Sequence, residues 1–262
     1  MSVGPVTAMQ IASHLDALLA VAETPDYPNA LNGLQVANRG RPVAAIAAAV
    51  DASARTIGAA ADAGANLLLV HHGLFWSGVQ PLRGAAYDRL RVLVERDLAV
   101  YSAHLPLDRD PTYGNNALLA RALGLTPTGP FAHFGALDIG VRGNDVRPTA
   151  ALVSAAHDFA RARGGAVVAS AFEPGRITRR WGICTGAGAD AATMREAGEL
   201  GIDTLIVGEG PHWTAVNAPE QGLVIIYAGH YATETLGVRA LAEHVGTTFG
   251  IPWSFIDAPT GL

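Results

Sequence analysis

Residues 64–76 read GANLLLVHHGLFW, an apolar run that ends in two adjacent histidines, and residues 201–213 read GIDTLIVGEGPHW. Continuous apolar runs of this length are typical of strands that are covered on both faces of a sheet. When the two stretches are aligned, five of the thirteen positions are identical: Gly64/Gly201, Leu68/Leu205, Val70/Val207, Gly73/Gly210 and Trp76/Trp213. The chain is therefore predicted to contain two structurally related halves.

Strands and helices are predicted to alternate around the first run. Residues 44–50 and 99–103 are further apolar runs, and helices are expected from Asp51-Ala52-Ser53 to about 63 and over about 87–96. In the second half, residues 181–185 match the first of these strands, and Asp190 is expected to start the helix that follows. This order predicts an α/β fold whose two halves have mainly parallel sheets.

A domain boundary is expected near residues 127–130, which contain two prolines and a glycine. Residues 1–126 are predicted to form the first α/β domain and residues 127–234 the second. The last predicted helix and strand, within residues 235–262, are expected to return to the first domain and complete it.

Composition narrows the class of protein. Of the 262 residues, 50% are hydrophobic and 16% are charged, which is typical of a globular protein with a large core. The formal net charge of −5 provides no basic surface for nucleic acid, so nucleic-acid binding is not expected. Cys184 is the single cysteine, and no apolar run reaches membrane-spanning length. A cytoplasmic protein without disulfides or membrane contact is therefore predicted.

Histidines and carboxylates follow the predicted strands in a repeated pattern. Residues 100–104 read VYSAH and lead to Asp108, and residues 226–230 read IYAGH and lead to Glu234. In parallel sheets, ligand-binding groups collect at the carboxyl ends of strands. If the two halves face each other across a pseudo-two-fold axis, these groups converge on one cleft with His71, His72 and Glu209.

Imidazole and carboxylate together favour Zn, Mn, Fe or Co. Five or six such groups are too many for one four-coordinate ion, and they suit two divalent ions bridged by a hydroxide. The alternatives are a solvated strand end for the histidine pair and an ordinary i,i+4 contact for His230 with Glu234. Their occurrence at matching repeat positions favours the metal site. The predicted ligands are His71, His72, Asp108, His230 and Glu234, and His104 is either a sixth ligand or a donor to one.

A set of short motifs resembles the NIF-three-like dinuclear-metal family, often named GTP cyclohydrolase I type 2. The motifs are Asn-Gly-Leu-Gln (32–35), His-His-Gly (71–73), His-Leu-Pro-Leu-Asp (104–108), Gly-Asn-Asn (114–116), Gly-Glu (208–209) and Gly-His-Tyr-Ala-Thr-Glu (229–234). The resemblance implies two metal ions on the same five ligands. It also implies a two-domain α/β subunit and a toroidal homo-hexamer with the metal clefts facing its cavity.

Two functions are compatible with these residues. The first is a metal-dependent hydrolase, cyclohydrolase- or phosphoesterase-like. In it a metal-bridging hydroxide attacks a small molecule such as a nucleotide, and Glu209 or His104 moves a proton. The second is a non-catalytic, metal-stabilised ring that binds a partner or handles metal. Gly186-Ala187-Gly188 also resembles a dinucleotide-binding turn, but the matching turn at 50–53 has no glycine.

Overall fold

The computed structural model describes residues 4–262, which divide into two compact units. Unit 1 contains the chain up to Leu107 together with Gly237–Ala258, and unit 2 contains Asp108–Leu236 together with Pro259–Leu262. The chain returns from unit 2 to unit 1 within helix α9 (His230–Phe249). Each unit has its own sheet, so the fold is mixed α/β with two sheets.

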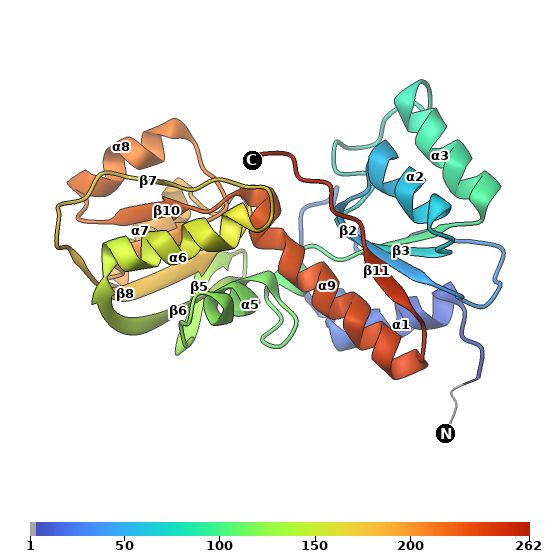
Figure 1. Ribbon diagram of the computed structural model, residues 1–262, viewed down its shortest axis with the longest axis horizontal. Helices are drawn as coiled ribbons and strands as arrows, with labels where there is room; N and C mark the ends of the chain where they lie inside the picture. Colours follow the sequence, from blue (N-terminus) through green and yellow to red (C-terminus); the bar gives the residue numbers. More distant parts are fainter. Residues whose placement is uncertain (1–3) are drawn as a thin grey trace. The chain divides into compact units, whose positions relative to one another are not determined.

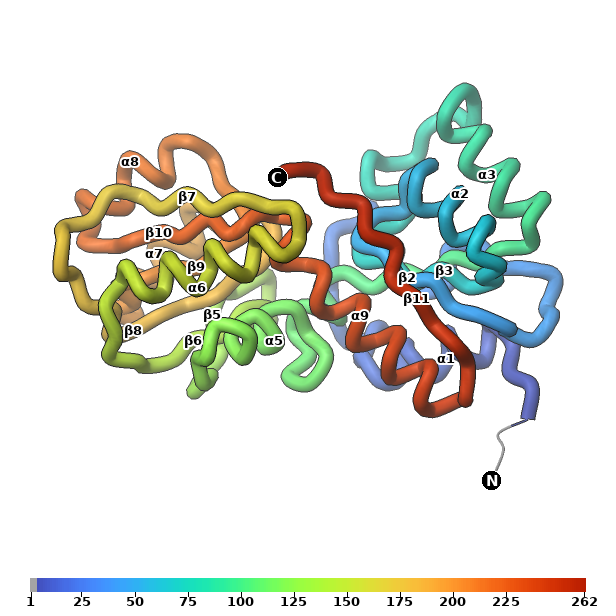
Figure 2. Tube along the Cα trace, viewed as in Figure 1, coloured from blue at the N-terminus to red at the C-terminus, as the bar shows by residue number. Residues whose placement is uncertain are grey.

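The sheet of unit 1 is parallel apart from one edge strand. Its strands, in spatial order, are β1 (Gly33–Val36), β4 (Ala99–Ser102), β3 (Leu67–His72), β2 (Ile46–Asp51) and β11 (Trp253–Phe255). β1 is antiparallel to β4, and every other neighbouring pair is parallel. β11 comes from the far end of the chain and lies beside β2 (Figure 2). Strand β11 thus extends the sheet of unit 1, whereas Pro259–Leu262 at the end of the chain belong to unit 2.

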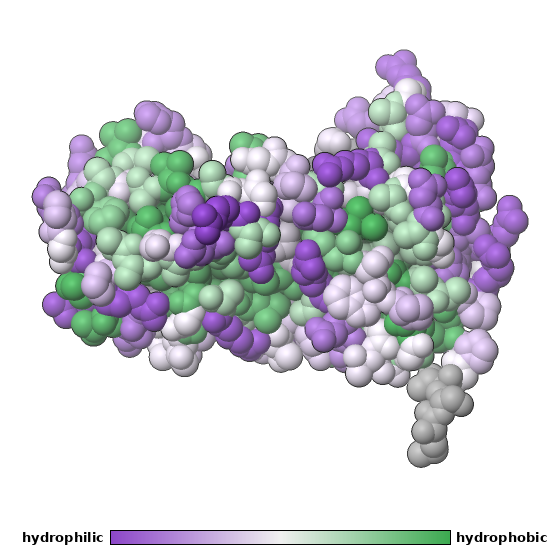
Figure 3. Space-filling view, viewed as in Figure 1, coloured by the Kyte–Doolittle hydropathy of each residue, from purple (hydrophilic) through white to green (hydrophobic). Residues whose placement is uncertain are grey.

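Helices cover both faces of this sheet (Figure 1). α2 (Ala54–Asp62) and α3 (Ala85–Arg96) pack on one face, where Ile57 and Leu93 join strand residues such as Leu68 in one apolar cluster. Leu93 is the buried residue of α3, and the outer surface of this helix is largely hydrophilic (Figure 3). α1 (Ala8–Leu18) covers the other face, where Tyr101 on β4 donates a hydrogen bond to Asp16.

The sheet of unit 2 combines parallel and antiparallel strands. In spatial order these are β5 (Gly129–Phe134), β6 (Leu137–Pro148), β8 (Ile177–Cys184), β9 (Thr204–Val207), β10 (Val224–Tyr227) and β7 (Val168–Ala169). β8, β9 and β10 are parallel. β5 with β6, β6 with β8, and β10 with β7 are antiparallel.

Two helices also cover each face of this second sheet. α5 (Asn115–Ala122) and α6 (Thr149–Arg161) pack on one face around the fully buried Trp181. α7 (Ala191–Glu199) and α8 (His212–Glu220) pack on the other, where Met194 and Ala218 contact strand residues of β9 and β10. Trp181 packs in the cluster on the first face, whereas the next residue, Gly182, lies against Phe131 and Ile202 of the cluster on the second face. Successive residues of β8 therefore face opposite sides of the sheet.

The predicted repeat is visible in the topology of the two sheets. β2, β3 and β4 in unit 1 are parallel neighbours, as are β8, β9 and β10 in unit 2. An antiparallel edge strand then pairs with the last member of each set, β1 with β4 and β7 with β10. The aligned apolar runs therefore form the central member of each parallel set, β3 and β9.

The prediction of mainly parallel sheets is wrong for unit 2. The segment from 129 to 148 forms a long antiparallel hairpin, which contains glycines in place of a continuous apolar run. Gly140 and Gly143 of β6 are required by close packing, because a Cβ on either would overlap Ile183 or Trp181 of β8. These glycines interrupt the apolar pattern by which a strand is predicted, and they also allow β6 and β8 to approach each other closely.

The division between the units falls at 107/108, whereas the sequence pattern places it near 126. The difference comes from α5, whose Leu119 and Ala120 pack with Leu152 and Trp181 in the core of unit 2. An apolar helix face does not by itself identify the sheet that will cover it. Across residues 4–262, the structure contains no helix long and apolar enough to cross a membrane.

Candidate metal centre

His71 and His72 are the last two residues of β3, at the carboxyl end of the unit 1 sheet. His71 is fully buried, and its Nδ1 lies 2.8 Å from the carbonyl oxygen of Ala103. A carbonyl oxygen can only accept a hydrogen bond, so Nδ1 carries the proton and Nε2 is the nitrogen with a lone pair. In this tautomer Nε2 is the nitrogen that can bind a metal ion.

His72 is held by the neighbouring strand. The parallel register of β2 and β3 places Asp51 opposite His72, and His72 Nδ1 lies 2.9 Å from Asp51 Oδ1. A carboxylate on Nδ1 orients the imidazole and makes Nε2 a stronger donor to a cation. Asp51 was expected only to start a helix. Instead it ends β2, and Ser53 caps the helix α2.

His104 has the same arrangement with a carboxylate from a distant loop. Its Nδ1 lies 2.9 Å from Asp26 Oδ1, and the Asp26 side chain is only 6% exposed. Burial alone would raise the pKa of Asp26, but the hydrogen bond and charge of His104, with bonds from Asn32 and Leu105, hold it below its usual value. Asp26 is therefore a fixed carboxylate that orients His104.

These three histidines form one cluster within unit 1. One potential ligand atom from each of His71, His72 and His104 lies within 4.8 Å of the others. The ring centroids are 4.7 Å apart for His71 and His72, and 4.9 Å apart for His71 and His104. Three oriented imidazoles at this spacing are a donor set that fits a divalent transition metal.

In unit 2, His230 and Glu234 occupy the first turn of α9. His230 Nε2 lies 3.2 Å from Glu234 Oε2, and His230 Nδ1 lies 2.8 Å from Glu209 Oε1. Burial alone would lower the pKa of His230, but hydrogen bonds and charge from Glu234 and then Glu209 outweigh it and raise the pKa to about 9. The Glu209 carboxylate therefore orients the His230 imidazole as Asp51 orients that of His72.

Asp108 is the last residue of the short helix α4 (Leu105–Asp108), which directly follows His104. It is buried, and two asparagines of α5 hold it: Asn115 Nδ2 donates to its Oδ1 at 2.8 Å, and Asn116 Nδ2 donates to its carbonyl oxygen at 3.2 Å. Burial, and then the charges of Asp108 and other carboxylates including Glu234, raise the pKa of the thiol of Cys184. Asp108 is therefore a buried carboxylate whose position is fixed by the two asparagines.

Glycines of the turn after β8 make room for these ligands. Gly186 has a φ of +62°, and a Cβ there would overlap Glu234 Oε1. A Cβ on Gly188 would overlap the carbonyl oxygen of Cys184. The resemblance of 186–188 to a dinucleotide-binding turn thus has another cause, because these glycines allow close packing around Glu234 and β8.

The structure brings most of the predicted residues together in two sets. His71, His72 and His104 cluster in unit 1, and Glu209, His230 and Glu234 cluster in unit 2, where Asp108 also lies. The sequence reasoning missed Asp26 and Asp51. Asp51 had a usable signal, since it ends the strand beside β3, but Asp26 lies 78 residues before His104 with no pattern that links them.

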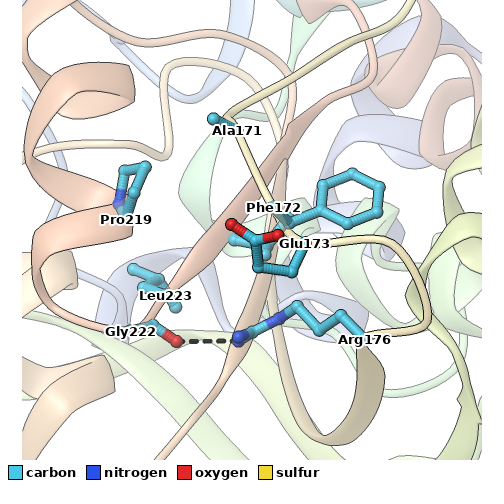
Figure 4. Close-up of a pocket in the computed structure, with 8 residues that line it drawn as sticks. Ala171, Phe172, Glu173, Arg176, Pro219, Gly222 and Leu223 are labelled. Carbon is cyan, nitrogen blue, oxygen red and sulfur yellow. Dashed lines mark hydrogen bonds between the residues drawn. The ribbon is translucent and has the colours of Figure 1, made fainter.

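A separate pocket of about 240 Å³ lies at the opposite end of the strands in unit 2 (Figure 4). Arg176 Nη2 donates there to the carbonyl oxygens of Gly222 and Asp203, both at 2.7 Å. These residues precede β10 and β9, whereas Glu209 and His230 follow the same strands. The Arg176 pocket is therefore not part of the candidate metal centre.

Comparison with known proteins agrees with the motifs. The family model for Duf34/NIF3 (NGG1p interacting factor 3) matches residues 6–260. A Deinococcus radiodurans protein named GTP cyclohydrolase 1 type 2 homolog is 44% identical over 237 residues, which are 90% of this chain and 88% of that protein. An Escherichia coli protein of the same name is 37% identical over 239 residues, or 89% and 91% of the two chains.

Solved structures show the same fold. The protein ybgI, described as of unknown function, matches with a TM-score of 0.87 and 33% identity over 98% of this chain and 100% of that one. HcgD from Methanocaldococcus jannaschii matches with a TM-score of 0.81 and 22% identity over 98% and 100%, a similarity of fold alone. The chain belongs to the Duf34/NIF3 (NGG1p interacting factor 3) family.

Proposed function

We propose that this protein binds two divalent metal ions through His71, His72, Asp108, His230 and Glu234 and acts as a metal-dependent hydrolase. The observation that carries the proposal is shared by all four histidines of the two clusters. Each places Nδ1 within 2.9 Å of a carbonyl or carboxylate oxygen: Ala103, Asp51, Asp26 or Glu209. This is the outer hydrogen-bond pattern of metal-binding histidines, in which Nε2 binds the ion.

The donor set is nitrogen and oxygen without thiolate, which suits Zn, Mn or Fe. Such ions, when bound, lower the pKa of water and polarise an electrophile. The proposal assigns proton movement to two groups of the chain itself. They are the Glu209 carboxylate, which is 42% exposed beside His230, and His104, which is not one of the five proposed ligands and whose Nδ1 is held by Asp26.

The relatives named GTP cyclohydrolase 1 type 2 homolog make a nucleotide the first class of substrate to test. We propose a small molecule such as a nucleotide as the substrate, and a homo-hexamer as the assembly, as the motif resemblance implies. Light scattering on protein purified without chelators gives the number of subunits.

The test replaces His72 or Glu234 by alanine. Each change removes a ligand, so bound metal and any hydrolysis should fall together, by more than the roughly 10- to 100-fold typical of losing an outer hydrogen-bond partner. Metal is measured by elemental analysis of protein purified without chelators. Nucleotides, phosphoesters and cyclic amides are then screened with the Zn, Mn and Fe forms.

Matched controls are His157→Ala and Glu243→Ala, which change exposed residues of α6 and α9. Both should keep full metal content and activity. Unchanged metal in His72→Ala and Glu234→Ala would contradict the ligand assignment. Full metal loading without turnover of any substrate would instead favour the non-catalytic, metal-stabilised ring.

A further inference from the structure

Two large aromatic side chains lie exposed beside the histidine cluster of unit 1. Trp76, in the loop after β3, is 38% exposed, and Tyr27, in the loop before β1, is 51% exposed. We call this pair the aromatic edge. Leu31, Val79 and Leu82, in the same two loops, are also exposed, so apolar side chains continue beyond the pair.

The aromatic edge is in direct contact with His72, a proposed ligand, and with His104 beside it. The indole ring of Trp76 lies 4.5 Å from His104 and 5.0 Å from His72, measured between ring centroids. Tyr27 lies 6.1 Å from Trp76 in an edge-to-face arrangement and 6.0 Å from His104. A planar group beside these rings would therefore lie next to the histidines where reaction is proposed.

Hydrogen bonds hold both loops in place. Gln35 Nε2 donates to the carbonyl oxygens of Ala30 and Leu31, and Gln35 Oε1 accepts from the Leu74 backbone at 2.8 Å. Gly73 permits this bridge, because a Cβ there would overlap the Gln35 amide. The backbone of Tyr27 donates to Asp26 Oδ1 at 2.6 Å. These bonds hold the backbone of the loops, and the ring contacts with His72 and His104 place the two side chains before a ligand arrives, which lowers the entropic cost of binding.

We propose that the aromatic edge binds the substrate by stacking on a planar heteroaromatic ring, with Trp76 as the main contact. Side chains that merely shielded the histidines from water would bury their own surface, whereas both rings keep large exposed areas. Aromatic stacking accepts any flat π-system and adds affinity without requiring a charged partner. The inference rests on the proposed function for the location of the reacting group, but ring binding is measured without turnover.

The test compares three probes that share a phosphate: a purine mononucleotide, a pyrimidine mononucleotide and ribose 5-phosphate. Calorimetry on metal-loaded protein gives each dissociation constant, after metal content has been measured. Both nucleotides should bind about tenfold or more tightly than ribose 5-phosphate. Trp76→Leu should remove most of this preference, Trp76→Phe should retain most of it, and Tyr27→Leu should reduce it.

Trp213→Leu is the matched control, since Trp213 is 40% exposed in unit 2, and it should leave the preference unchanged.

If Trp76→Leu fails to fold, Trp76→Phe and Tyr27→Leu still decide the outcome. Equal affinity of a metal-loaded wild type for all three probes would overturn the inference while the proposed metal site stands. Absence of bound metal would overturn the proposed function alone, because the three probes are then titrated against the metal-free protein, where the same preference would support the inference and equal affinities would overturn it. A change of assembly state in Trp76→Leu without a change in preference would also overturn the inference.

Discussion

Asp51 and Asp26 affect the candidate centre through the imidazole nitrogens that face away from a metal. Each carboxylate accepts from an Nδ1 at 2.9 Å, which fixes both the tautomer and the ring plane. The Asp51 side chain is 38% exposed, whereas that of Asp26 is 6% exposed and accepts further bonds from Asn32 and the backbone of Leu105. Asp51 is therefore the cleaner position for a substitution, because fewer other contacts depend on it.

Asp51→Asn is expected to weaken metal binding by about tenfold or more, within the range for partners of ligating histidines. The amide keeps the shape of the side chain but removes the negative charge that strengthens His72 as a donor. Competition with a chromogenic zinc chelator measures the affinity. Asp62→Asn changes a 76% exposed carboxylate and should have no effect. An unchanged affinity in Asp51→Asn would show that Asp51 does not act through His72.

At the scale of the elements, the first turn of α9 places an imidazole and a carboxylate one turn apart. Helix N-termini disfavour a positive charge, so a protonated His230 depends on the carboxylates of Glu234 and Glu209. These raise its pKa to about 9, against an ordinary value of 6.5, despite burial. Because the folded-state pKa is raised, the proton stabilises the metal-free fold fully below pH 6.5, and this contribution is lost as pH rises towards 9.

The chelated protein is therefore expected to lose thermal stability between pH 6.5 and 9, on the order of a few degrees in Tm. Glu234→Gln should flatten this slope, because it removes the charge that holds the proton. Scanning calorimetry of the chelated protein across this pH range provides the measurement. A flat profile for the wild type would contradict the role of His230 as the proton-binding group.

At the same scale, some elements could be predicted from local patterns and others could not. The strands β3 and β9 follow from continuous apolar runs, and α7 begins after Asp190, whose side chain caps it by accepting from Thr193. The β5–β6 hairpin was missed, because Gly140 and Gly143 break the apolar pattern for reasons that lie in other strands. A glycine that is required by packing against another strand cannot be predicted from the residues of its own segment.

For the whole molecule, the proposed function implies that metal binds the folded state alone and stabilises it. Removing it should lower the free energy of unfolding by about 4 kcal/mol if the free metal had been at about a thousand times its dissociation constant. For a chain of this size, the Tm should fall by roughly 10 °C. Thermal denaturation with and without a chelator measures the shift.

His72→Ala provides the internal comparison for this experiment. It should melt near the temperature of the chelated wild type, and a chelator should shift it far less. An equal chelator shift in the wild type and in His72→Ala would place the stabilising metal elsewhere in the protein.

The sequence alone determined the repeated strand-and-helix order, the family and the histidines and carboxylates that end the strands. These are local properties: apolar runs, capping residues and motifs can be recognised before any folding. Only the tertiary structure decided that α5 belongs to unit 2 and that Asp51 and Asp26 hold His72 and His104. It also decided that Trp76 and Tyr27 lie beside those histidines. Such pairings depend on strand register and loop path, which bring together residues far apart in the chain, and no single segment encodes them.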